Sequence, residues 1–363
     1  MIRIAFTLLI LVSAAQSQQG FINIDGADLK SKLTTALSRG SAQRGTFWVA
    51  YAFDVRPGVV FDTEFIGSGG SRVTVNGAAF AADAGTRNLG AFLMYEGGAG
   101  RPPIRAEIYN LDRRRDYSGY PVYWLGRISG SDSLPFLRGL IDTTQSYDAT
   151  RHLVDAIGAH EDARVATVLR EIVRSAKVER ARTAALSWLG HSAGQTDFLA
   201  ALVRDERETV AVRREAAETI GDSEVSPAVL QDLYRAVTHR EVKRELLEAM
   251  GERFEPSAVA FLIETIQREP DRDLKEEAID ALADMEDDRA IDALARAYDS
   301  ARDEEMKKEI LDALGDAESS LALQKLQSVA QRDPSIRLRR QAIEALGESH
   351  DPSALRFLEQ LIK

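Results

Sequence analysis

The sequence has 363 residues, 44% apolar and 28% charged, proportions that are ordinary for a folded globular protein. It contains no cysteine, which excludes disulfides, thiol catalysis and thiolate metal sites. The formal charge of −11 is unevenly spread: residues 1–120 carry 13 basic and 10 acidic side chains, and residues 121–363 carry 33 and 47. Because the acidic C-terminal part repels phosphate backbones, nucleic acid is not expected as a partner.

The first 17 residues are predicted to be a secretory signal peptide. Arg3 supplies a short positive start, residues 4–12 are apolar, and residues 13–17 include small side chains suited to cleavage. Nine apolar residues are too few for a transmembrane anchor, which needs about 20. We therefore expect export to a bacterial periplasm or the extracellular space, without a membrane anchor after signal cleavage.

Residues 18–119 are predicted to form a small α+β module. Residues 28–38 have the apolar spacing of a helix, and residues 46–55 alternate like a strand with apolar groups on both faces. Gly-rich turns are expected at 67–70 and 97–100. Further strands are expected at 59–65, 72–76, 89–95 and 104–111. We expect an antiparallel sheet with one helix packed on it.

From about residue 120 the spacing becomes helical, and an apolar residue followed by Gly recurs every 30–32 residues, with Ala283 replacing the Gly once. This period indicates stacked helical hairpins, each ending at the repeat Gly. Gly favours the left-handed conformation that ends a helix, and an Ala two places earlier lets helices approach closely. The repeated ends are Leu125-Gly126, Ile157-Gly158, Leu189-Gly190, Ile220-Gly221, Met250-Gly251, Leu282-Ala283, Leu314-Gly315 and Leu346-Gly347.

Two segments of this array resemble a known family. Val212 to Gly221 and Asp351 to Leu355 are similar to the short HEAT repeats of the phycobilisome-lyase type. The resemblance spans about residues 121–363 and implies seven hairpins plus a final helix at 351–362. The layout also resembles secreted HEAT-repeat proteins of soil bacteria, a likeness that implies no activity. The expected fold is thus α+β overall: an antiparallel β-rich module followed by an all-α, HEAT-like α-solenoid at 120–363.

One motif favours an enzyme. Gly190-His191-Ser192-Ala193-Gly194 matches G-x-S-x-G, the nucleophile elbow of α/β-hydrolases, with Ser192 as nucleophile and His239 or His350 as its base. That elbow requires a preceding strand, whereas residues 184–189 are in register with the second helices of the other repeats. We interpret the motif as a loop, and serine hydrolase remains an alternative function.

HEAT arrays that resemble deoxyhypusine hydroxylase hold iron through His-Glu pairs, seven and six places before the Gly. This chain lacks His there, so no metal or cofactor is expected. The isolated His160-Glu161 pair is interpreted as a solvated surface pair. The residues in the two positions are Arg214-Glu215, Arg244-Glu245, Glu276-Glu277, Lys308-Glu309 and Arg340-Gln341.

Acidic residues recur on the second helices at two repeat positions, and positions three apart share a helix face. Stacking should align them into columns on the concave side, a candidate groove for a protein partner, with a basic partner as one option. Three places before the Gly stand Asp155, Glu218, Glu248, Asp280, Asp312 and Glu344; six places before stand Glu215, Glu245, Glu277 and Glu309.

The alternative is a solvated face with pairs inside each helix, because basic residues lie four places before four of these acids. Those basic residues are Arg214, Arg244, Lys308 and Arg340.

A second candidate site is aromatic. Trp124 and Trp188 occupy a repeat position that is Ala in most other repeats, with Tyr123 and His191 beside them. These side chains are expected either to fill the junction with the β-rich module or to form an exposed binding patch.

We predict an exported, non-enzymatic scaffold that binds a protein partner through the concave face or the N-terminal module. The alternatives are a serine hydrolase using Ser192 and a lyase-like chaperone for a cofactor-bearing protein.

Overall fold

The computed structural model describes residues 20–57, 59–62, 72–75, 88–97, 100–112, 115–144, 146–285, 287–317, 319–349 and 351–362. The predicted signal peptide, the Gly-rich turn at 67–70 and His350 lie outside these residues. The chain divides into two compact units, Met1–Ala185 and Leu186–Lys363, which are described separately.

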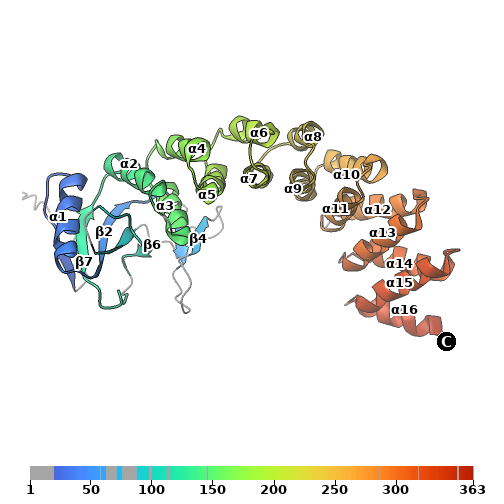
Figure 1. Cartoon of the computed structure of the whole chain (residues 1–363). Coiled ribbons are helices and arrows are strands. Elements are labelled where there is room, and N and C mark those ends of the chain that lie inside the picture. The colour runs from blue at the N-terminus through green and yellow to red at the C-terminus, as the bar shows by residue number, and fades with distance from the viewer. Residues whose placement is uncertain are drawn as a thin grey trace, which may run out of the picture. The chain divides into compact units, whose positions relative to one another are not determined.

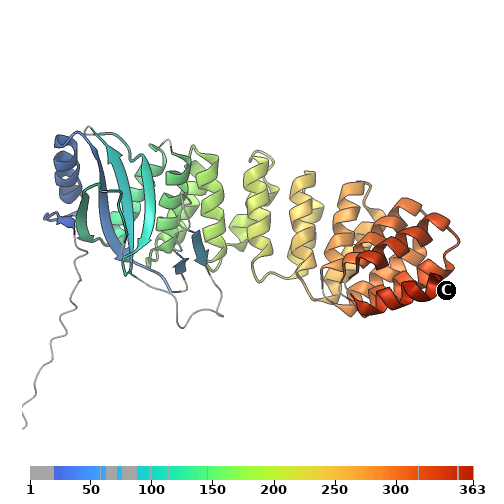
Figure 2. The ribbon, with the colours of Figure 1, turned by 90° about the horizontal axis from the view of Figure 1, so that it is seen from below.

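The first unit contains a five-stranded sheet in the order β1-β7-β2-β5-β6, and its strands β2, β5 and β6 pair antiparallel as predicted. Strand β7, however, runs parallel to both β1 and β2, so the sheet is mixed and the prediction of a purely antiparallel sheet is wrong (Figures 1 and 2). The strands are β1 (Phe21–Asn23), β2 (Thr46–Asp54), β5 (Asn88–Glu96), β6 (Arg105–Asn110) and β7 (Val122–Arg127), with β3 (Val59–Asp62) and β4 (Arg72–Val75) as a separate pair.

Strand β7 contains Leu125-Gly126, which the sequence period assigned to the end of a helix. That assignment is wrong. Residues Trp124 and Arg127 pair with Ala50 and Ala52, so two residues of β7 lie opposite one residue of β2. This is a β-bulge, and Gly126 adopts a positive φ of 80° there, a conformation that Gly takes without strain.

Three helices, α1, α2 and α3, pack against strands of this sheet. Helix α1 (Leu29–Ala42) is capped by Asp28 and buries Leu33 and Ala36, and its Gly40 lies against the ring of Phe47. The first helical hairpin, α2 (Gly130–Ile141) and α3 (Tyr147–Ala159), contacts β2 and β6 and belongs to the same compact unit. The sheet continues past the predicted boundary between residues 119 and 120, as far as Arg127 in β7.

The remaining helices form the predicted hairpins. Along the described part of the chain there are seven hairpins, α2–α3 to α14–α15, and a final helix α16, as predicted. Within the second unit the first helices of the hairpins form one layer and the second helices another (Figure 1). The helices after α3 are α4 (Val165–Ser175), α5 (Glu179–Gly190), α6 (Thr196–Arg204), α7 (Val210–Gly221), α8 (Pro227–Ala236), α9 (Arg240–Gly251), α10 (Pro256–Arg268), α11 (Arg272–Ala283), α12 (Asp288–Ser300), α13 (Glu304–Asp316), α14 (Ser320–Arg332), α15 (Ile336–Glu348) and α16 (Pro352–Ile362).

The repeat glycines serve close helix packing. The predicted left-handed helix ends are wrong, because Gly190, Gly221, Gly251 and Gly315 have no positive φ. A Cβ on Gly221 would instead lie 2.6 Å from the Cβ of Ala249 in the next second helix. Equivalent contacts join Gly251 to Ala281 and Gly315 to Ala345. The predicted role of the Ala two places before the Gly is therefore confirmed at these joints.

No helix among the described residues is both long and apolar enough to cross a membrane.

Candidate functional site

The second helices of the second unit carry two rows of acidic side chains. Row A consists of Glu215, Glu245, Glu277 and Glu309, six places before each repeat end. Row B consists of Glu218, Glu248, Asp280, Asp312 and Glu344, three places before it. Helices α7, α9, α11, α13 and α15 supply them, one repeat after another, so stacking aligns the rows as predicted.

Each acid of row A has a donor in the preceding second helix. Ser187 Oγ donates to Glu215 Oε1 at 2.5 Å. Arg214 Nε donates to Glu245 Oε1 and Arg244 Nε to Glu277 Oε2, each at 2.7 Å. Arg272 Nη2 donates to Glu309 Oε1 at 3.0 Å. Glu245, Glu277 and Glu309 are therefore paired with guanidinium groups of neighbouring repeats, and Glu215 accepts a hydrogen bond from a hydroxyl group.

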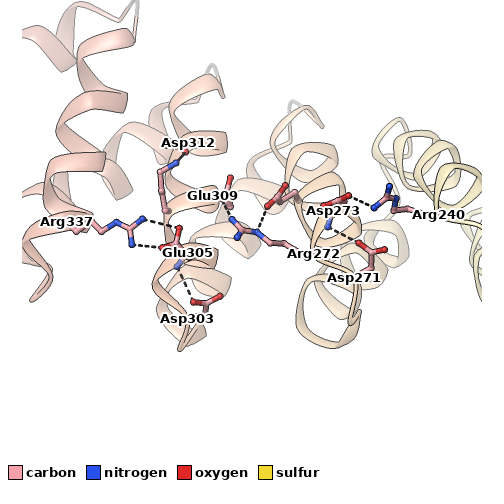
Figure 3. Close-up of polar contacts among 11 residues, drawn as sticks. Arg240, Asp271, Arg272, Asp273, Asp303, Glu305, Glu309, Asp312 and Arg337 are labelled. Carbon is pink, nitrogen blue, oxygen red and sulfur yellow. Dashed lines mark hydrogen bonds and ion pairs between the residues drawn. The ribbon is translucent and has the colours of Figure 1, made fainter.

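Further ion pairs join the N-terminal halves of these helices. Arg240 Nη1 lies 2.6 Å from Asp273 Oδ2, and Arg337 Nη1 lies 2.5 Å from Glu305 Oε1. Figure 3 shows both pairs, with Arg272 between them reaching Glu309. Long guanidinium side chains can span adjacent helices, so the ion pairs form a ladder from repeat to repeat. The expectation of pairs inside each helix is met by Lys308 and Asp312, at 2.7 Å.

Row B is electrostatically different on α7, α9 and α11. Among the described residues, the side-chain carboxylates of Glu218, Glu248 and Asp280 make no hydrogen bond or ion pair. Desolvation, followed by repulsion from neighbouring carboxylates of row A, raises the pKa of Glu218 and Glu248. The same causes raise the pKa of Asp280 to about 6. These three carboxyl groups therefore form a stripe of negative charge that has no cation in direct contact among the described residues.

The other acidic residues of the predicted columns either have partners for their charge or lie apart from these three carboxyl groups. Asp312 accepts hydrogen bonds from Lys308 and from Gln341. Glu344 lies on α15, and α13 with the compensated Asp312 separates it from the other three acids of row B. Asp155 belongs to α3 in the first unit, is only 5% exposed, and lies 3.8 Å from Arg151. The candidate site thus narrows to the stripe of Glu218, Glu248 and Asp280.

The predicted aromatic patch is not a single surface. Tyr123 and Trp124 lie on β7, and Trp188 lies in α5, so they do not share a repeat position. Tyr123 and Trp188 are buried, and Tyr123 packs edge-on against Phe47. Trp124 packs on Phe21, and His191 lies edge-on to Trp188 with ring centroids 6.3 Å apart. Because Tyr123 and Trp188 belong to the core, the four residues cannot form an exposed patch.

The G-x-S-x-G segment has helical surroundings. Gly190 ends α5, and the Ser192 amide donates to the Leu189 carbonyl in the turn that follows. The residues before it are helix rather than the strand that a nucleophile elbow needs.

Sequence reasoning missed a buried Ser-His pair. The Ser133 hydroxyl donates to His160 Nε2 at 2.9 Å, and it accepts from Tyr51 Oη at 2.8 Å. His160 also stacks on Phe53, with centroids 4.1 Å apart, so the prediction that it is a solvated surface residue is wrong. Ser133 is 0% exposed, so the pair connects α2 and the end of α3 to the sheet and offers no access to a substrate.

The comparisons with known proteins agree with the helical geometry. The model of the HEAT repeats family matches residues 235–315 and 299–363. The chain contains HEAT repeats. No curated protein matches the sequence. The HEAT assignment therefore establishes architecture, and any activity must be argued from the residues themselves.

Solved structures similar to this HEAT-repeat chain include human deoxyhypusine hydroxylase in complex with glycerol. It is 18% identical over 64% of this chain and 90% of that chain, with a TM-score of 0.30. The Escherichia coli protein YibA is 16% identical over 60% of this chain and 82% of that chain, with a TM-score of 0.35. Sequence identities and TM-scores as low as these give no information about the activity of this protein.

The HEAT array offers no evident metal cluster. Among the described residues, no group of three or more His, Asp or Glu side chains is arranged to hold a metal ion. The row A position beside Glu245 is occupied by Arg244, which pairs with Glu277.

Proposed function

We propose that the protein is an exported, non-enzymatic scaffold, and that the stripe of Glu218, Glu248 and Asp280 binds a basic segment of a protein partner. The contrast between the two acidic rows supports this proposal. Three of the four acids of row A form ion pairs with guanidinium groups, whereas no carboxylate of the stripe forms a hydrogen bond or ion pair among the described residues, although both rows lie on the same helices. A basic segment would supply the missing positive charge and lower the repulsion among the carboxylates.

The spacing of the stripe defines the partner more closely. Neighbouring packed helices lie about 8–10 Å apart. A polyproline II segment advances about 3.1 Å per residue with three residues per turn, so every third side chain lies on the same side and falls opposite the next helix. The preferred segment thus has polyproline II conformation, with Lys or Arg at every third position. Export rests on the predicted signal peptide at residues 1–17, and the apolar run there is the feature that supports it.

A peptide titration tests the binding site. One fluorescent peptide carries three Lys residues at every third position, and a second has the same composition with its Lys residues contiguous. We expect the spaced peptide to bind more tightly at low ionic strength. Neutralising the stripe with Glu218→Gln, Glu248→Gln and Asp280→Asn should weaken its binding about tenfold, since three exposed charge interactions contribute about 0.5 kcal/mol each.

The matched control removes the same charge from the other layer. The control variant carries Asp197→Asn, Asp232→Asn and Asp288→Asn, at exposed positions of the first helices α6, α8 and α12. This control should bind the spaced peptide like the parent protein. Equal affinity for the two peptides, or equal loss in both triple variants, would show that net charge alone attracts peptides and would refute the stripe as a site.

A further inference from the structure

The joints between consecutive first helices are of two kinds, which alternate along the second unit. At two joints a tyrosine near the end of one helix donates to an acid at the end of the next. Tyr234 Oη donates to Glu269 Oε2 at 2.7 Å, joining α8 to α10. Tyr298 Oη donates to Asp333 Oδ2 at 2.8 Å, joining α12 to α14. We call these the stitched joints.

Basic residues strengthen the stitched joints. Lys243 Nζ lies 3.2 Å from Glu269 Oε2 and 4.5 Å from the centroid of the Tyr234 ring. Lys307 and Lys325 each lie 4.9 Å from the centroid of the Tyr298 ring. The hydroxyl, the carboxylate and the ammonium groups therefore hold two successive repeats together in a partly buried setting, where such contacts are stronger than in water.

The joint between α10 and α12 lacks the stitch. Its tyrosine position is Ile266 and its acid position is Ala301, each 32 residues from the corresponding residue of the next stitched joint. Ile266 is buried and offers apolar contact alone. The tyrosine–acid link is thus absent at the joint between the two stitched ones, where Arg289 of α12 instead donates to the exposed Phe254 carbonyl before α10, at 2.9 Å.

The second helices at this same joint are also packed differently. Elsewhere a glycine allows the close approach, as at Gly251 against Ala281 and Gly315 against Ala345. At this joint Ala283 replaces the glycine, and its methyl group keeps α11 and α13 apart. Accordingly, α11 and α13 are in less extensive contact than α9 with α11 or α13 with α15.

We propose that the joint between the hairpins α10–α11 and α12–α13 is a hinge at which the second unit bends. At this joint the second helices lose their close contact and the first helices lose the tyrosine–acid hydrogen bond, so rotation there meets less resistance than at either neighbouring joint. The exposed pair of Arg272 and Glu309 crosses the hinge, but a surface ion pair between long side chains restrains rotation weakly. This inference does not depend on the proposed partner.

Spin-label distances test the hinge, and the absence of native cysteine makes labelling specific. Ala260, Asp292 and Gln324 are equivalent exposed residues of α10, α12 and α14. The full chain carrying Ala260→Cys and Asp292→Cys reports on the hinge, and Asp292→Cys with Gln324→Cys reports on a stitched joint. We expect a broader distance distribution across the hinge. Equal widths would overturn the proposal.

Two sets of substitutions then add the stitched contacts to the hinge or remove one from a stitched joint. Ile266→Tyr with Ala301→Asp and Ala283→Gly copies the stitched joint into the hinge and should narrow its distribution to the width found between α12 and α14. Tyr298→Phe removes a single hydroxyl from the stitched joint, where it should broaden the distribution without unfolding the protein. A hinge distribution that stays broad in a folded triple variant, or a stitched joint unaffected by Tyr298→Phe, would refute the mechanism.

Discussion

The position that a Cβ would take on Gly221 lies 2.6 Å from the Cβ of Ala249, closer than two methyl groups can approach. This relationship recurs between successive second helices and explains the 30–32-residue period through packing. The same comparison identifies Gly347, whose added Cβ would meet nothing within 4 Å. The two glycines therefore respond differently to one methyl group.

Gly221→Ala should destabilise the protein by about 1–2 kcal/mol, because overpacking outweighs the helix propensity that Ala adds. Gly347→Ala should stabilise it by about 0.5–1 kcal/mol, since only the propensity gain remains. Urea unfolding of the two variants measures both effects. Equal changes in the two variants would show that close packing is not the reason for the repeat glycine.

Asp280→Asn should stabilise the protein at pH 7–8. The folded pKa of about 6 lies above the ordinary value of 3.8, so the ionised group disfavours the folded state above pH 6. This penalty disappears as the pH falls through 6 towards 4, where the group is protonated in the folded state. Because the residue is exposed, the gain should be below about 1 kcal/mol at pH 7.5 and absent below about pH 4. Unfolding at several pH values measures it, with Asp232→Asn as the control that should show no such trend.

His160 should remain neutral down to about pH 4, because burial lowers its pKa from 6.5 to about 4. The unfolded chain binds a proton at this residue below about pH 6.5, and the folded protein does not until about pH 4. The free energy of unfolding should therefore fall by about 2–3 kcal/mol between these values. In the His160→Gln variant, this part of the decrease in the free energy of unfolding with falling pH should be absent. An NMR titration of His160 with a midpoint near 6.5 would contradict the prediction.

The ion pair between Arg244 of α9 and Glu277 of α11 should contribute a measurable coupling energy between neighbouring repeats. In a double-mutant cycle of Arg244→Met and Glu277→Gln, urea unfolding should give a coupling energy of about 0.3–1 kcal/mol at low salt. The coupling should decrease in 1 M salt, where the Debye length is about 3 Å. Arg244→Met combined with Glu264→Gln, whose side chains belong to separate ion pairs, should be additive. A coupling energy of zero at low salt would show that this ion pair does not stabilise the contact between the two repeats.

A fluorophosphonate probe should label neither Ser192 nor Ser133. Ser192 lies in a turn after a helix, and Ser133 is 0% exposed, so neither has the accessible, activated hydroxyl that the probe requires. Mass spectrometry of the treated protein makes the measurement. Labelling that is lost in Ser192→Ala would establish the hydrolase alternative in place of the scaffold.

The helical array follows from the amino-acid sequence, because its evidence is local. A hairpin needs apolar residues at helical spacing and a stop about every 32 residues, and both are visible in the order of residues from Ile157-Gly158 to Leu346-Gly347. The number of hairpins and the acidic rows followed from that register.

Features that depend on partners distant in the chain are visible only in the tertiary structure. Leu125-Gly126 fits the repeat register, yet pairing with β1 and β2 makes it a bulged strand. His160 became a core residue because Phe53 and Ser133 surround it. Arg214 and Arg244 each had an acid four places away in their own helix, but stacking placed a row A carboxylate of the next repeat within reach. Which acids remain uncompensated therefore depends on the distance between helices, which no local pattern encodes.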